Sequence, residues 1–233
     1  MIKTLLLTGQ NNHDWKRSSP FCKNLLEKSG KFQVDMTEDP SAALADREKL
    51  SKYQLIFLDY NGPAWSEPAK ANFVDAVRNG TGVCIVHAAN NAFSGWKEYE
   101  EICALLWREG TGHGRYHKFD IKVTDPGHPI TKGLPPVLKD HPDELYHRLV
   151  HMHNTPHHVI ATAYSAPETG GTGNDEPMLV VKTYGKGRIF HDILGHVWEG
   201  GGMDTFESPH FQLTLLRGCE WAATGAVTIT KED

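Results

Sequence analysis

Short, continuous apolar runs separated by helix-like stretches constrain the fold of this chain most strongly. They cover residues 3–9 (KTLLLTG), 55–60 (LIFLDY) and 82–87 (GVCIVH), with a weaker run at 32–37 (FQVDMT). Continuous rather than alternating apolar character is typical of strands buried on both faces of a parallel sheet. The first half of the chain therefore predicts an α/β protein with helices on both faces of a mostly parallel sheet.

A Ser close to a Pro marks the expected start of three helices, because Ser can cap free backbone N–H groups and Pro fits the first turn. Gly30 and Gly80 follow as stop signals for the first two. We expect helices after Ser19-Pro20, over 41–52, after Ser66, along Trp96, Tyr99, Cys103 and Leu106, and after Ser208-Pro209, where Ser208 is expected to cap the last helix.

The pattern changes after residue 115, where polar and apolar residues begin to alternate. This indicates added β-hairpins, the last turning at 185–187. The expected strands are 118–124, 145–151, 159–165 and a pair within 177–194. No linker or internal repeat interrupts the chain, so residues 1–233 are expected to form a single domain.

Charge and composition exclude several classes of function. The formal net charge of -5 offers no positive field for nucleic acid or an anionic membrane. No apolar run approaches the roughly 20 residues of a membrane span, and no export signal opens the sequence, so we expect a cytoplasmic protein. The phosphate-binding pattern G-x-x-x-x-G-K-[ST] is absent, so no nucleotide cofactor is expected. The oligomeric state stays open, a homo-oligomer included.

Polar and aromatic residues follow four of the predicted strands. These loops are 11–15, 61–65, 87–91 and 195–198. The carboxyl ends of parallel strands open on one edge of a sheet, where α/β proteins bind their ligands. We therefore expect the four loops to converge on one pocket.

Six motifs recur in order along nearly the whole chain. They are TG-x-N-x-H-D-W from Thr8, G-x-G-V-x-I-V-H-A-A over 80–89, Gly112-His113, His128 to Thr131, Asp143 to Tyr146, and Gly185 to Arg188 leading to Leu194-Gly195-His196. Together they resemble the ThuA-like (trehalose utilisation) family. The resemblance implies a single-domain three-layer sandwich of the class I glutamine amidotransferase-like, flavodoxin-like type, and a role in bacterial breakdown of trehalose or related sugars.

The strand-turn-helix segment at 82–91 has the form of a nucleophile elbow, but His87 occupies the turn. The resemblance implies this replacement of the usual Cys. Cys84 lies within the strand between apolar neighbours, whereas a catalytic thiol needs an exposed, electropositive turn. Cysteine-dependent glutamine hydrolysis is therefore not expected.

Three histidines at strand ends are candidate metal ligands: His13, His87 and His196. Three neutral imidazoles can hold Zn²⁺ or another divalent transition metal and leave a position for water or substrate. The alternative is hydrogen-bonded pocket histidines without a metal. His113, between two glycines, and His87 are also candidate catalytic residues.

Glu144 is the candidate general base, because burial would raise its pKa. The alternative is a solvated carboxylate or an ion pair with Arg148, and Asp143 is the weaker candidate. His128 is expected in a turn, and His157-His158 as a solvated pair. Aromatic rings and amides suited to sugar binding, or to ordinary packing, are Asn11, Trp15, Asn61, Trp65, Asn90 and Trp198.

Two hypotheses follow for a small-molecule carbohydrate partner. The first is a metal-dependent hydrolase, lyase or isomerase acting on a keto-sugar or disaccharide. The second is a non-catalytic carbohydrate-binding or regulatory domain that keeps the pocket without the chemistry. Metal analysis of the purified protein separates them.

Overall fold

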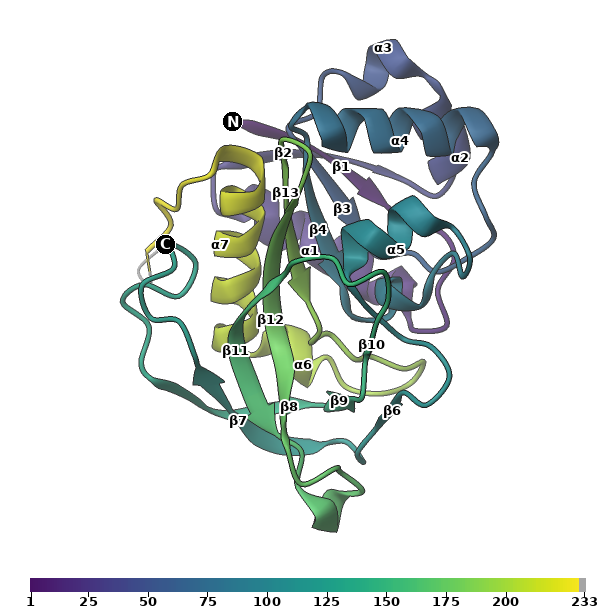
Figure 1. Ribbon diagram of the computed structural model, residues 1–233. Helices are drawn as coiled ribbons and strands as arrows, with labels where there is room; N and C mark the ends of the chain where they lie inside the picture. The colour runs from purple at the N-terminus through teal and green to yellow at the C-terminus, as the bar shows by residue number, and fades with distance from the viewer. Residues whose placement is uncertain (231–233) are drawn as a thin grey trace.

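A nine-stranded mixed sheet forms the centre of the computed structural model, which describes residues 1–230 (Figure 1). The strand order is β2-β1-β3-β4-β13-β12-β11-β7-β8. Its strands are β1 (Ile2–Leu7), β2 (Phe32–Thr37), β3 (Leu55–Leu58), β4 (Gly82–Val86), β7 (His117–Val123), β8 (Val137–Asp143), β11 (His158–Tyr164), β12 (Asp175–Tyr184) and β13 (Gly187–Asp192).

The sheet has two halves that differ in strand direction. We call β2, β1, β3, β4 and β13 the parallel half, because each neighbouring pair is parallel. The antiparallel half consists of β12, β11, β7 and β8, and β12 joins it to β13 through an antiparallel hairpin. Two small ladders accompany this half, β5 (Leu105–Leu106) with β10 (Val150–His151) and β6 (Gly112–His113) with β9 (Tyr146–His147).

Helices cover both faces of the parallel half, which gives the predicted three-layer α/β sandwich. On one face of the sheet, the helix residues Leu26 and Leu215 pack with the strand residues Leu6 and Phe57. On the other face, the helix residue Phe73 packs with the strand residues whose side chains point to that side. Short α6 precedes α7. The helices are α1 (Trp15–Lys28), α2 (Pro40–Ala45), α3 (Arg47–Leu50), α4 (Glu67–Asn79), α5 (Lys97–Cys103), α6 (Asp204–Glu207) and α7 (Pro209–Thr224). Within residues 1–230 no helix is both long and apolar enough to cross a membrane.

Helix α1 begins at Trp15, before the predicted start at Ser19-Pro20. Pro20 lies inside the helix. Ser18 and Ser19 are buried and donate their hydroxyl hydrogens to Asp59 (2.6 and 2.7 Å). The Ser-Pro signal was wrong here because the serines satisfy a buried carboxylate rather than the helix end.

The segment 97–151 departs most from the sequence prediction. Helix α5 ends at Cys103, and Leu106 lies in β5 instead. The strand predicted over 145–151 is two short strands, separated at Arg148, whose φ is +56°. Strand β8, with its bend at Asp140 (φ +55°), was not predicted because its polar sequence VLKDHPD lies at the sheet edge and shows no regular alternation.

Candidate functional site

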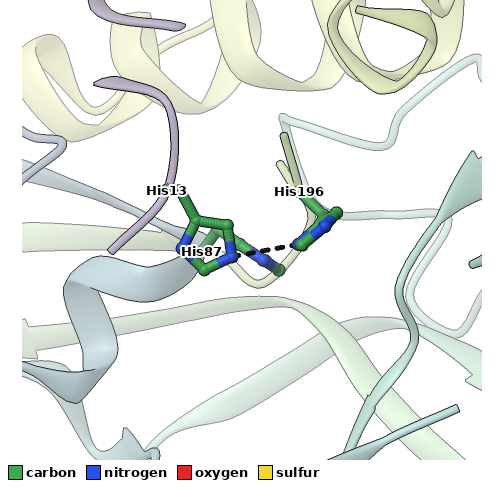
Figure 2. A group of neighbouring side chains, drawn as sticks. All are labelled: His13, His87 and His196. Atoms are coloured by element: carbon green, nitrogen blue, oxygen red, sulfur yellow. Dashed lines mark hydrogen bonds between the residues drawn. The ribbon is translucent and has the colours of Figure 1, made fainter. Parts of the chain in front are cut away.

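Three histidines meet at the carboxyl edge of the parallel half (Figure 2). His13 lies between β1 and α1, His87 directly follows β4, and His196 follows β13. One potential ligand atom from each lies within 4.8 Å of the others, and His13 Nε2 is 2.9 Å from His196 Nδ1. The structure thus brings together the three residues predicted as metal ligands, as the common edge of parallel strands requires.

His87 occupies the turn after β4 with a φ of +45°, a conformation rare for a residue with a side chain. Its Nδ1 lies 2.8 Å from the carbonyl oxygen of Ile193, so Nδ1 carries the proton. The buried Nε2 has no hydrogen-bond partner within the described residues. A buried lone pair without a donor is costly, and a cation would satisfy it.

Two amide side chains fix the orientation of His13. Asn61 donates its Nδ2 hydrogen to Asn12 Oδ1, which identifies that oxygen as an acceptor. His13 Nδ1 lies 3.2 Å from the same oxygen and therefore carries its proton there. The Nε2 lone pair of His13 is thus directed at His196.

A second chain of hydrogen bonds holds the backbone of His13. Asn11 donates from Nδ2 to the buried Asp59 (2.8 Å) and accepts from the N–H of His13 at 3.0 Å. Asn61 also donates to the carbonyl of Ala88 (3.2 Å), beside His87. Asn11 and Asn61 therefore position the histidines.

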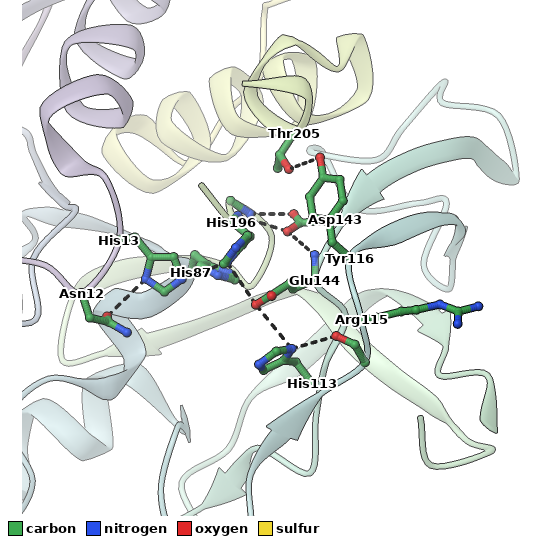
Figure 3. A network of polar contacts seen from close by, with 12 residues as sticks. Asn12, His13, His87, His113, Arg115, Tyr116, Asp143, Glu144, His196 and Thr205 are labelled. Carbon is green, nitrogen blue, oxygen red and sulfur yellow. Dashed lines mark hydrogen bonds and ion pairs between the residues drawn. The ribbon is translucent and has the colours of Figure 1, made fainter. Parts of the chain in front are cut away.

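Asp143, at the end of β8, holds the loop that carries His196 (Figure 3). Its carboxylate accepts the backbone N–H of Gly195 at 2.8 Å, of His196 at 3.1 Å and of Glu144 at 2.7 Å. The side chain is completely buried. One carboxylate thus fixes a histidine loop of the parallel half and the neighbouring acid of the antiparallel half.

Asp143 is itself tied to helix α7. The buried His141 places Nε2 3.3 Å from Asp143 and Nδ1 3.1 Å from Ser208 Oγ. Ser208 occupies the N-cap position of α7 as predicted, but its side chain makes no capping bond. The hydroxyl instead partners His141, which corrects the predicted role.

Glu144 faces the histidine cluster. Its Oε2 lies 3.1 Å from His196 Nδ1 and 3.4 Å from His113 Nδ1 (Figure 3). Burial raises the pKa of Glu144 above its usual value, as a general base working near neutral pH requires. The two candidate proton-transfer residues, Glu144 and His113, are thus neighbours.

Burial keeps the three clustered imidazoles neutral. It lowers the pKa of His13 to about 4, with His196 adding to the effect. The pKa of His87 falls well below its ordinary value, and that of His196 is lowered too, in both cases chiefly by burial. Neutral imidazoles are the form that binds metal ions.

A cavity of about 290 Å³ opens beside the cluster. A larger depression of about 530 Å³ runs along α4 and contains none of the clustered histidines, so we assign the chemistry to the smaller one. Its lining comprises Asn12, His13, Ala88, Asn91, Trp107, His113, Glu144, Tyr146, His196 and Trp198.

Of the six residues predicted to bind substrate, Trp198 alone is among those lining the described cavity. Trp65 is 3% exposed and packs among Phe73, Phe93 and Trp96, so it belongs to the core. Asn90 is fully buried, with Nδ2 3.4 Å from His191 Nε2. Trp15 begins α1, outside the lining. Loop position alone did not reveal side-chain direction.

The remaining predicted residues take the places expected of structural groups. Cys84 is buried within β4, and burial raises the pKa of its thiol well above the ordinary value. His128 accepts the N–H of Ile130 in a turn (3.3 Å). His158 is exposed and lies 2.8 Å from Asp125.

Sequence reasoning missed Trp107 and Tyr146, which form the inner wall of the cavity. Their rings make an edge contact at 4.5 Å, and Tyr146 stacks on His87 at 4.0 Å. Tyr146 stands two residues after Glu144 in a motif already singled out, so that motif could have revealed it. Trp107 follows the two-residue strand β5, which no sequence pattern predicts.

Fold and site together define an α/β sandwich protein with a histidine cluster at the sheet edge. Residues 3–222 match the ThuA family, described as trehalose utilisation. A ThuA-like protein from Parabacteroides merdae has 41% sequence identity and a TM-score of 0.88, covering 98% of this chain and 92% of that one. The chain therefore belongs to the ThuA family.

More distant structures share the fold alone. A ThuA-like protein from Bacteroides uniformis has 18% identity and a TM-score of 0.67, with 97% of this chain and 94% of that chain covered. A cytoplasmic protein from Salmonella typhimurium LT2 has 15% identity and a TM-score of 0.66, with 95% and 99% covered. No curated protein matches the sequence.

Proposed function

We propose that this chain is a metal-dependent enzyme of sugar catabolism, acting on a keto-sugar or a disaccharide related to trehalose. The family description supports the sugar pathway. The observation that carries the enzymatic part is the convergence of His13, His87 and His196 beside the carboxylate of Glu144. A cytoplasmic location fits the Salmonella relative described by that word.

The three imidazoles fit a divalent transition metal such as Zn²⁺. They are neutral, their protonated nitrogens are fixed in His13 and His87 by oxygen acceptors, and the Nε2 of His87 is buried without a partner. When bound, the ion would polarise a carbonyl or hydroxyl oxygen of the sugar.

Glu144 would remove a proton from the carbon next to the sugar carbonyl. Its raised pKa allows it to hold that proton. In an elimination, the electrons of the broken C–H bond form a C=C bond as the C–O bond to the leaving group breaks, and Glu144 returns the proton to the leaving oxygen. In an isomerisation, Glu144 returns the proton to the former carbonyl carbon, while the hydroxyl proton on the deprotonated carbon moves to the former carbonyl oxygen, so that a new carbonyl forms at the deprotonated carbon. His113 Nδ1 lies 3.4 Å from the same carboxylate and donates its hydrogen to the carbonyl of Gly114 at 2.7 Å, so the Nε2 of His113 is the nitrogen that can accept a proton. Asp143 accepts the backbone N–H groups of Glu144 and His196 and so fixes the positions of these two residues relative to each other.

Metal analysis of protein purified without chelators tests the proposal. We expect one transition-metal ion per chain, lost together with turnover of keto-sugar substrates in His87→Ala and His196→Ala. His158→Ala removes an exposed histidine and should change neither quantity. A wild-type protein that binds sugars but contains no metal would instead support a non-catalytic carbohydrate-binding domain.

A further inference from the structure

In the proposed complex the sugar carbonyl or hydroxyl takes the metal position, and the rest of the cavity beside the histidine cluster offers, among the residues that the structure describes, no cationic side chain for an anionic group. Its lining, as given for residues 1–230, contains neither lysine nor arginine, and its one carboxylate is Glu144. Proteins recognise phosphates and carboxylates mainly through Arg, Lys and free N–H groups of helix ends. A negative group entering here would instead face Glu144.

The arginine side chains near the cavity are bound to other groups or point away from it. Arg17 binds Asp14 at 2.6 Å and the carbonyls of Trp198 and Gly201 at 2.7 Å each. Arg108 is paired with the buried Glu100 at 3.1 Å. Figure 3 shows the side chain of Arg115 directed away from the histidines. A substrate phosphate therefore finds no ready partner.

Aromatic rings bound the cavity on two sides. Trp107 and Tyr146 form the inner wall, and Trp198 stands at the mouth with 44% of its surface exposed. Trp198 is kept there by Arg17, which binds its carbonyl, and by an edge contact with Tyr116 at 5.2 Å. Apolar ring faces of this kind pack against the C–H face of a sugar.

The volume limits the size of the occupant. At about 290 Å³ the cavity lies at the lower end of ligand pockets, which measure about 300–1,000 Å³. This space suits a single pyranose ring, with Asn12, Asn91 and His113 available to its hydroxyls. Any second ring would extend past Trp198 into solvent.

We propose that the site accepts one uncharged sugar ring, free or as the terminal unit of a neutral disaccharide, and rejects sugar phosphates and acidic sugars. This inference rests on the proposed function, because it names the substrate class of the same cavity. Trp198 is the specificity-determining residue at its mouth.

Calorimetric titration of the metal-loaded protein with glucose, trehalose, glucose 6-phosphate and glucuronate tests the inference. We expect the neutral sugars to bind at least about tenfold more tightly than the two anions, a difference of about 1.4 kcal/mol. Trp198→Ala should weaken neutral-sugar binding about tenfold, with Trp198→Phe restoring most of it. Trp15→Ala, which changes a tryptophan outside the lining, serves as the matched control.

Two outcomes overturn the inference in distinguishable ways. Binding of glucose 6-phosphate or glucuronate as tight as that of glucose, with metal bound and turnover of keto-sugars intact, removes the inference and leaves the proposed function standing. If none of the four sugars binds while the protein stays folded by circular dichroism, the inference fails. If the same protein also binds no metal and turns over no keto-sugar, the proposed function fails with it. Equal effects of Trp198→Ala and Trp15→Ala would remove Trp198 from its assigned role.

Discussion

The parallel and antiparallel halves of the sheet contribute different things to the site. The parallel half supplies the three histidines, each from a loop that follows a strand buried on both faces. The antiparallel half supplies Glu144, and the ladders beside it supply His113 and Tyr146. Loops after strands of the parallel half thus carry the histidine cluster, while short strands and loops beside the antiparallel half carry other residues that line the cavity.

Asp143 links the two halves at the site through its side chain, and among the proposed substitutions its removal should have the largest effect. Asp143→Ala leaves three backbone N–H groups and His141 without their acceptor, so we expect the free energy of unfolding to fall by about 3–5 kcal/mol. Urea titration measures this. Asp125→Ala is the control, because that aspartate also accepts backbone and histidine hydrogens but is partly exposed. A loss for Asp143→Ala no larger than the control's would show that the hydrogen bonds of Asp143 add little to the stability of the junction between the halves.

The milder Asp143→Asn variant distinguishes the role of Asp143 in positioning His196 from its contribution to the stability of the fold. It keeps the size of the side chain but replaces one acceptor oxygen by a donor that faces an N–H group. We expect a folded protein with weaker metal binding, measured by competition with a chromogenic chelator. Wild-type metal affinity in this variant would contradict a positioning role.

The junction strand β13 carries His191, whose burial makes stability depend on pH. Burial lowers its pKa from 6.5 to about 3, against a smaller opposing effect from Cys103. Below pH 6.5 the unfolded chain gains a proton that the native state does not, so stability falls as the pH falls, until about pH 3. Between pH 7 and pH 5 this group alone should contribute a loss of about 2 kcal/mol.

His191→Gln should flatten that dependence, as measured by urea titration at a series of pH values. The exposed His158→Gln variant controls for the replacement of a histidine at the surface. Parallel curves for His191→Gln and wild type would mean that His191 takes up a proton in the folded protein as readily as in the unfolded chain.

Replacing Ser208 tests the contact between the antiparallel half and helix α7. Ser208→Ala leaves the buried His141 Nδ1 without a partner, and we expect a loss of about 1–2 kcal/mol in thermal or urea unfolding. Ser66→Ala is a matched control, because Ser66 occupies the same N-cap position of α4 but is exposed and makes no side-chain cap bond. Equal losses would point to helix capping instead of the His141 contact.

Replacing Cys84, which lies three residues before His87, should have the smallest effect on stability. Cys84→Ala removes one buried sulfur from the core of the parallel half, and we expect a stability loss of about 1 kcal/mol with unchanged metal content and turnover. His87→Ala provides the contrast within the same strand-turn unit. Loss of turnover in a well-folded Cys84→Ala variant would reopen a thiol mechanism.

The predictability of the two halves from sequence differs for a physical reason. Strands β1, β3 and β4 are buried on both faces, so each leaves a continuous apolar run that fixes it and the residue that follows it. Strands β1 and β4 precede His13 and His87 in this way, whereas β13, which precedes His196, was predicted from the hairpin turn at 185–187. Strand β8 lies at an edge and its partly exposed residues leave no such run, so no strand was predicted there and Asp143 was considered only as the weaker candidate base.

Side-chain direction was the second limit. Trp65 and Asn61 belong to the same loop after β3, yet the first turns into the aromatic core and the second hydrogen-bonds Asn12. Their directions depend on which partners lie nearby in space, such as Phe93 and Asn12, and those partners come from distant parts of the chain. Residue type and loop position could not distinguish these outcomes.

The distance along the chain between site residues has a consequence for how this protein can be cut or recombined. His13 and His196 are hydrogen-bonded although 183 positions separate them, and Asp143 bridges to His196 across 53. No contiguous fragment shorter than residues 13–196 contains the cluster, so a truncation at either end that removes one of these segments removes the whole site. The site therefore cannot be grafted onto another protein as a short segment, because the whole sheet is needed to bring its residues together.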